Sequence, residues 1–178
     1  NIKNNRVRLF FENGSFSCIV IFENRKGIFM ANVHPYLSFN NTKEALSYYQ
    51  RVLGATNIVR MPVSEEQAEQ FGIPQEKLNE ATMHSQFDIL GTTIMAADNF
   101  HCDDLSYTGF SILLDLNSED EVALKKAQAF WKYVLESGEV EINMPFEEQF
   151  WGGAMGDFID KYGVRWLLHA QPYSKISK

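Results

Sequence analysis

Two stretches of the chain repeat one pattern: PYLSFNNTKEALSYYQRVLGATNIVRMPV (Pro35–Val63) and FSILLDLNSEDEVALKKAQAFWKYVLESGEVEINMPF (Phe110–Phe146). Each predicts a strand, a capped helix, a glycine at the helix end and a second strand that closes on Met-Pro. Corresponding residues, such as Gly54 and Gly138, are about 83 residues apart. The chain is therefore predicted to contain two copies of one βα unit, with a ligand site in the cleft between the packed copies.

The first copy extends beyond the quoted stretch. A strand over 33–39 precedes Asn41 and Glu44, which form a capping-box-like pair at the start of a helix that ends at Gly54. A strand over 56–63 follows, and residues 81–90 and 92–100 predict a hairpin about Gly91. The polar segment 64–80 between them is predicted to be an excursion from the unit, in the position of a lid.

The second copy follows a polar linker over 101–108 and begins with a strand over 110–117. Ser118 and Glu121 predict a second capping box, and the helix that follows ends at Gly138. Three further strands are expected over 140–145, 153–160 and 164–170. The last one carries apolar side chains on both faces, which predicts a central position in its sheet.

The composition bounds the class of protein. The chain has 178 residues, of which 45% are hydrophobic, and this suffices for one globular domain with a large core. A net charge of −7 without a Lys/Arg-rich run argues against nucleic acid and anionic membranes as partners. No apolar run reaches the roughly 20 residues of a membrane span. Cys18 and Cys102 lack CxxC spacing, and the sequence shows no export signal, so a reducing cytoplasm is expected.

The leader over residues 1–29 precedes the duplicated body. Its sequence RVRLFFENGSFSCIVIFE predicts a β-hairpin around Glu12-Asn13-Gly14, because Asn-Gly favours tight hairpin turns. Two interpretations stay open. The leader is either a native ribbon, or translated upstream sequence, since Lys26-Gly27 back-translates to a purine-rich element just before the Met30 codon.

A strand-helix-strand-strand-strand unit that occurs twice resembles the vicinal-oxygen-chelate superfamily of glyoxalase I, extradiol dioxygenases and bleomycin-resistance proteins. PYLSF with EALSYYQRVLGA, MHSQF, and above all QFWGGAMGDFIDKYGVRWLLH are similar to its PhnB-like branch, often labelled 3-demethylubiquinone-9 3-methyltransferase. The resemblance implies an α+β domain over 30–178 with βαβββ modules over 33–100 and 109–172. These modules are expected to form a curved mixed sheet around a cleft, in a homodimer.

The resemblance also permits a test of metal chemistry. Metal-using members place four His/Glu ligands on the first and last strands of the modules, and these positions correspond here to His34, Met95, Ser111 and Leu167. A thioether, a hydroxyl and an alkyl group do not replace two carboxylates and an imidazole around a divalent cation. We therefore predict no metal site and no cofactor, although His34 is retained. There is also no GxGxxG motif to support the methyltransferase label.

Two histidines lie on predicted strands and are candidates for acid–base chemistry. His84, in the hairpin, is the predicted catalytic residue, and His169 is the second candidate. The alternative for both is a hydrogen-bonded structural histidine, because the sequence identifies no acidic partner.

Aromatic residues around Gly152, Gly153 and Gly156 predict the ligand-contacting wall. Glycine permits a close approach of backbone and ligand, and aromatic walls favour flat or apolar ligands. The alternative is that half of these rings fill the core. The predicted ligand-binding residues are Tyr36, Phe146, Gln149, Trp151, Phe158 and Trp166.

The function predicted first is the binding of a small, partly aromatic or apolar organic molecule in the cleft, with catalysis left open. The alternatives are a non-catalytic sequestering protein, as bleomycin-resistance proteins are, and a metal-dependent lyase, isomerase or dioxygenase. Tight binding with the ligand recovered unchanged would indicate sequestration, whereas turnover would indicate an enzyme.

Overall fold

The computed structural model describes residues 6–12, 15–21, 32–100 and 104–175, with side chains from residue 32 onward. The chain divides into two compact units, Asn1–Val33 and His34–Lys178. The first unit contains strands β1 (Arg6–Glu12) and β2 (Ser15–Ile21), which pair antiparallel with Glu12 opposite Ser15. The two strands of the predicted hairpin are thus present, while Asn13 and Gly14 of its turn lie outside the described residues.

The first module of the second unit contains β3 (Tyr36–Phe39), α1 (Thr42–Val52), β4 (Thr56–Pro62), β5 (Thr82–Ile89) and β6 (Thr92–Asp98). Its sheet has the strand order β3-β6-β5-β4, in which only the β3–β6 pair is parallel. We call it sheet 1. The excursion between β4 and β5 contains α2 (Glu65–Phe71) and a 3₁₀ turn (Gln75–Lys77).

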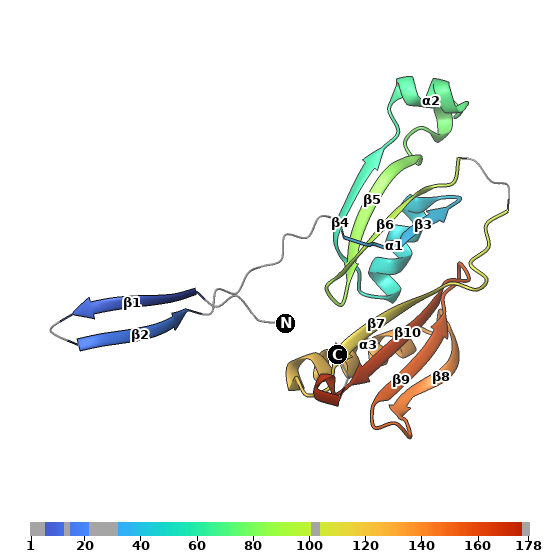
Figure 1. Ribbon diagram of the computed structural model, residues 1–178. Coiled ribbons are helices and arrows are strands. Elements are labelled where there is room, and N and C mark those ends of the chain that lie inside the picture. Colours follow the sequence, from blue (N-terminus) through green and yellow to red (C-terminus); the bar gives the residue numbers. More distant parts are fainter. Residues whose placement is uncertain (1–5, 13–14, 22–31, 101–103, 176–178) are drawn as a thin grey trace. The chain divides into compact units, whose positions relative to one another are not determined.

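The second module repeats this plan with β7 (Ser111–Asn117), α3 (Glu121–Ser137), β8 (Glu141–Glu148), β9 (Ala154–Ile159) and β10 (Arg165–Gln171). Sheet 2 has the order β7-β10-β9-β8, in which only the β7–β10 pair is parallel. The α+β fold with two βαβββ modules is therefore confirmed, as two four-stranded sheets (Figure 1). The predicted central position of β10 is also confirmed.

The sequence signals at the helix ends account for α1. Asn41 Oδ1 accepts a hydrogen bond from the Glu44 amide at 3.0 Å, as an N-cap does. Glu44 itself does not complete the box, since its carboxylate binds Lys161 Nζ at 2.7 Å. Gly54 has a φ of 62° and ends the helix in the left-handed region.

The predicted capping box at the second helix is wrong. The N-cap of α3 is Asp120, whose Oδ1 accepts from the amides of Val122 and Ala123 at 2.9 and 3.2 Å. Ser118 instead donates its amide to the Gln171 carbonyl at 2.9 Å, which keeps it at the end of the sheet. The helix consequently starts two residues later than the Ser118–Glu121 spacing indicated.

The two modules share one hydrophobic core. Helices α1 and α3 each pack on one face of the sheet of their own module, and α1 also contacts α3. Buried rings from both modules meet in this core, among them Phe39, Tyr49 and Phe87 of the first and Phe158 and Trp166 of the second. The opposite face of each sheet carries no helix of the described chain, and we call it the open face. Among the described helices, none is long and apolar enough to cross a membrane.

Candidate functional site

The open face of sheet 1 is amphipathic. Strand alternation directs Phe87 and Ile89 of β5 into the core and His84 and Gln86 to the open face. Tyr36, Met95, Gln86 and Val59 form one row across the four strands by their pairing register. Tyr36, Val59 and the neighbouring Met61 are each about half exposed, so apolar area lies beside hydrogen-bonding groups.

The predicted catalytic residue His84 lies on this face. Its Nδ1 is 3.5 Å from the Tyr36 hydroxyl, and the two rings are tilted with centroids 5.9 Å apart. The structure thus brings together two predicted site residues, Tyr36 and His84. No carboxylate of the described chain is hydrogen-bonded to His84, so its part in proton transfer stays a prediction.

The open face of sheet 2 carries a histidine that does have a carboxylate partner. His169 Nδ1 lies 2.7 Å from Asp115 Oδ1, across the parallel pair β10–β7. Tyr173 donates its hydroxyl to Asp115 Oδ2 at 3.0 Å, and Gln171 Nε2 donates to Oδ1 at 3.3 Å. Burial, and then the bond to Asp115, raises the pKa of Tyr173. The phenol therefore stays protonated and a donor at neutral pH.

A second polar pair lies on the same face. Asp157 is almost fully buried on β9, and the Arg165 guanidinium of β10 binds both of its carboxylate oxygens. Asn143 on β8 lies 3.4 Å from Asp157 Oδ1. Between this pair and Asp115–His169 lie Leu113, which is half exposed, and Leu167, so the face alternates fixed polar groups with apolar ones.

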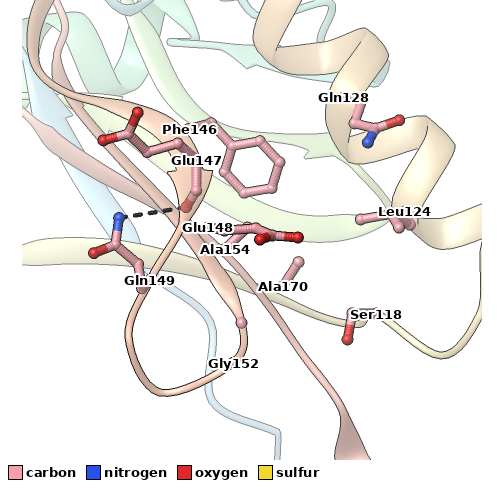
Figure 2. Close-up of a pocket in the computed structure, with 11 residues that line it drawn as sticks. Ser118, Leu124, Gln128, Phe146, Glu147, Glu148, Gln149, Gly152, Ala154 and Ala170 are labelled. Carbon is pink, nitrogen blue, oxygen red and sulfur yellow. Dashed lines mark hydrogen bonds between the residues drawn. The ribbon is translucent and has the colours of Figure 1, made fainter.

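A pocket of about 440 Å³ opens on the helix side of sheet 2, beside the β8–β9 turn (Figure 2). Phe146 and Glu148 of β8 extend toward Leu124 and Gln128 of α3, as Figure 2 shows. Ser118, Ala154 and Ala170 complete the wall. Gln149, also predicted to bind the ligand, turns back so that its Nε2 donates to the Glu147 carbonyl at 3.3 Å.

The residues of the predicted aromatic wall lie partly in the core and partly on the surface. Phe158 and Trp166 are fully buried and stack with an interplanar angle of 8°, so they are core residues and line no described pocket. Trp151 lies in the β8–β9 turn, 44% exposed, with Phe150 edge-on at 5.0 Å. The six predicted ligand-binding residues therefore do not converge on one cavity: Tyr36 lies on sheet 1, and Phe146 and Gln149 border the helix-side pocket.

The glycines of this segment serve packing. A Cβ on Gly156 would lie 2.6 Å from the Trp131 ring and 2.9 Å from Phe146 Cβ. A Cβ on Gly153 would lie 2.7 Å from the Ala170 carbonyl oxygen. The two glycines thus let neighbouring elements approach closely: α3 at Gly156 and β10 at Gly153.

Three of the four positions that correspond to metal ligands lie on strands: Met95 on β6, Ser111 on β7 and Leu167 on β10. The fourth, His34, lies two residues before β3. Met95 pairs with Tyr36 and Leu167 with Leu113, while His34 Nδ1 lies 3.2 Å from the Thr93 carbonyl. The described residues contain no group of three or more His, Cys, Asp or Glu side chains that could hold a metal ion. The donor set does not fit a divalent cation, because three of the four side chains are those of Met95, Ser111 and Leu167.

Comparison with known proteins agrees with this topology. A family model described as 3-demethylubiquinone-9 3-methyltransferase matches residues 31–169. The chain belongs to this family. Protein YjdN of Escherichia coli K12 is 32% identical over 142 residues, which cover 76% of this chain and 92% of YjdN. The predicted resemblance to the PhnB-like branch is confirmed.

Two solved structures share the fold of this chain. Protein PA1353 from Pseudomonas aeruginosa is 27% identical with a TM-score of 0.55, covering 80% of this chain and 98% of that one. A variant of the fosfomycin resistance protein FosX from Listeria monocytogenes, complexed with Mn(II), is 16% identical with a TM-score of 0.53. The alignment covers 83% of this chain and 98% of FosX. The likeness to FosX shows the fold alone.

Asp115 was not predicted from the sequence as the partner of His169. The signal was available in the module plan, since the first and last strands of each βαβββ unit pair in parallel. Asp115 shares the outward face of its strand with Leu113, and His169 shares that of its strand with Leu167. Aligning β7 with β10 so that Leu113 pairs with Leu167 would have placed the Asp115 carboxylate opposite the His169 imidazole.

Proposed function

We propose that the chain binds a small, partly aromatic or apolar organic molecule against the open faces of its sheets, as a homodimer and without a divalent cation. The observation that supports this most is the composition of those faces. Half-exposed apolar side chains, such as Tyr36, Met61 and Leu113, lie beside hydrogen-bonding side chains. The orientation of those polar side chains is fixed by hydrogen bonds to their neighbours. Such a surface can hold the carbon skeleton of a ligand and orient its polar groups.

The same exposed apolar area supports the proposed homodimer. Soluble chains rarely leave contiguous apolar patches uncovered, and a second copy covers them in a symmetric assembly. The open face of one copy then becomes one wall of an enclosed chamber, and the partner copy supplies the other wall.

Cation-dependent chemistry finds no support in the residues present. Of the four positions that correspond to metal ligands, only His34 carries a side chain that commonly binds a divalent metal. The side chains of Met95 and Leu167 do not bind a hard divalent cation. Methyl transfer, which the family's description names, has no recognisable cofactor-binding motif in this chain, because no GxGxxG sequence is present.

Native mass spectrometry of freshly purified protein tests the proposal. The expected species is a dimer that carries an organic molecule, which denaturation releases. A monomer without added mass, or one equivalent of a divalent metal by elemental analysis of protein purified without affinity metal, contradicts it.

Recovery of the released molecule separates binding from catalysis. A stoichiometric ligand recovered unchanged after incubation indicates a sequestering protein, and conversion indicates an enzyme. If His84 takes part in the reaction, His84→Ala reduces turnover more than it reduces the affinity for the ligand.

A further inference from the structure

We propose that His169 is a proton-transfer group on the open face of sheet 2, and that Asp115 positions it with its outer ring nitrogen free to accept a proton. This inference rests on the proposed function, because it requires a small molecule bound against the same face. It assigns to that molecule an acidic C–H or O–H group.

The tautomer of His169 follows from its partner. An ionised carboxylate only accepts hydrogen bonds, so the 2.7 Å contact to Asp115 Oδ1 places the hydrogen of neutral His169 on Nδ1. The lone pair is then on Nε2. No side chain or backbone group of the described chain is hydrogen-bonded to Nε2, and the side chain is 15% exposed. The acceptor nitrogen is thus left for a molecule on the open face.

Asp115 is itself held from two further directions. Tyr173 and Gln171 each donate to one of its oxygens, and the short 3₁₀ turn that carries Tyr173 is fixed by the bond from its amide to Asn117 Oδ1 at 3.1 Å. A base whose orienting carboxylate is fixed in this way keeps its geometry without a ligand, as acid–base catalysis requires.

The surroundings of His169 suit a partly apolar substrate. Leu167, two residues away on β10, and Leu113, two residues from Asp115 on β7, lie on the same face about 7 Å along their strands. Met155 is the cross-strand partner of His169 on β9. These side chains can contact the carbon skeleton while the acidic hydrogen points to Nε2.

The step balances without an oxidant or reductant. Nε2 forms a bond to the proton, the C–H or O–H bond breaks, and its electron pair stays on the substrate. The imidazolium then returns the proton to another atom of the same molecule or to water. The rival explanation is structural: the pair would only tie the edge strand β7 to the C-terminal segment, and Nε2 would have no role.

Nitrogen NMR of the histidine rings provides the first test. We expect the Nδ1–H tautomer for neutral His169 in the wild type. In Asp115→Ala the Nε2–H tautomer should predominate, because the carboxylate acceptor is gone. A wild-type His169 in the Nε2–H form overturns the proposal.

The second test adds 5-nitrobenzisoxazole, an apolar bicyclic probe whose ring opens when a base removes its C3 proton as the N–O bond breaks. The wild type should accelerate the opening above the buffer background, and His169→Gln should lose about tenfold or more of that acceleration. Asp115→Ala should lose most of it, and Tyr173→Phe less. His34→Gln is the matched control and should retain the wild-type rate, because the His34 side chain is hydrogen-bonded to the Thr93 carbonyl and, among the described residues, to no carboxylate.

Equal rates in wild type and His169→Gln, with both variants folded by circular dichroism, overturn the assignment. Because the probe is added and not co-purified, this failure concerns His169 alone. The absence of a retained ligand in native mass spectrometry concerns the proposed function alone.

Discussion

Tyr49 donates its hydroxyl to Asp160 Oδ2 at 2.7 Å, and this hydrogen bond joins helix α1 of the first module to the β9–β10 turn of the second. The same oxygen accepts from Trp166 Nε1 at 2.9 Å. Asp160 Oδ1 accepts from the amides of Tyr162 and Val164. One buried carboxylate therefore sets the conformation of the turn and the contact between modules, which accounts for the aspartate of the DKYG sequence in this turn.

Tyr49→Phe removes one donor from this carboxylate without changing the ring. We expect the free energy of unfolding to fall by about 1–3 kcal/mol, because a buried acceptor loses a partner. Tyr133→Phe is the matched control. The Tyr133 hydroxyl of α3 also donates a hydrogen bond between the two modules, to the Arg51 carbonyl in the last turn of α1 at 2.7 Å, but this bond lies at an exposed site. Its loss should be about 0.5 kcal/mol or less. Urea denaturation of both variants measures the difference, and equal losses would contradict the importance of the buried bond.

Asp160 should also make the stability depend on pH. Burial raises its pKa above the ordinary 3.8, outweighing the hydrogen bonds that lower it. The folded chain therefore binds this proton more tightly than the unfolded chain. The resulting stabilisation is fully present below the ordinary pKa and is lost as the pH rises through the folded-state pKa. We expect the difference in unfolding free energy between wild type and Asp160→Asn to decrease as the pH rises through that window. A difference that increases instead would mean that the hydrogen bonds dominate.

The repeated sequence pattern predicted the fold because it combined several local signals. Alternating strands, the Asn41 cap and the helix-ending glycines all specify local geometry, and the structure keeps each of them. The N-cap prediction for Ser118 was wrong because residues that cap helices also occur in turns. The position of Ser118 is set by the hydrogen bond from its amide to the Gln171 carbonyl, which lies far along the chain.

The candidate site was harder to predict because it depends on which face each strand turns outward. Trp166 and Phe158 have the composition of a ligand wall, but alternation on a strand covered by α3 directs them into the core. Asp115 has no local feature that distinguishes it from a solvated acid. Its role emerges only from its register against His169, 54 residues away.

Gly156 tests how closely α3 packs on sheet 2. Gly156→Ala should lower the free energy of unfolding by about 1–3 kcal/mol, because the added methyl group would overlap the Trp131 ring at 2.6 Å and neither helix nor strand can move freely. In a Trp131→Leu background the same substitution should cost less, since the ring that it meets is gone. Thermal unfolding of the four proteins gives both differences. An equal cost in the two backgrounds would show that the clash is with the backbone or Phe146.

The place where the ligand binds can be decided with two substitutions on opposite sides of sheet 2. Leu113→Asp puts a charge on the open face between the Asp115–His169 and Asp157–Arg165 pairs, and we expect it to abolish ligand retention and dimer formation while the monomer stays folded. Leu124→Trp fills the helix-side pocket of Figure 2 and should leave both unchanged. Val122→Asp is the control for the added charge, because it is exposed in the first turn of α3, where an acidic side chain is favourable. Native mass spectrometry of the three variants reports oligomeric state and bound mass together. Loss of the ligand in Leu124→Trp with retention in Leu113→Asp would move the binding site from the open face to the pocket beside Phe146.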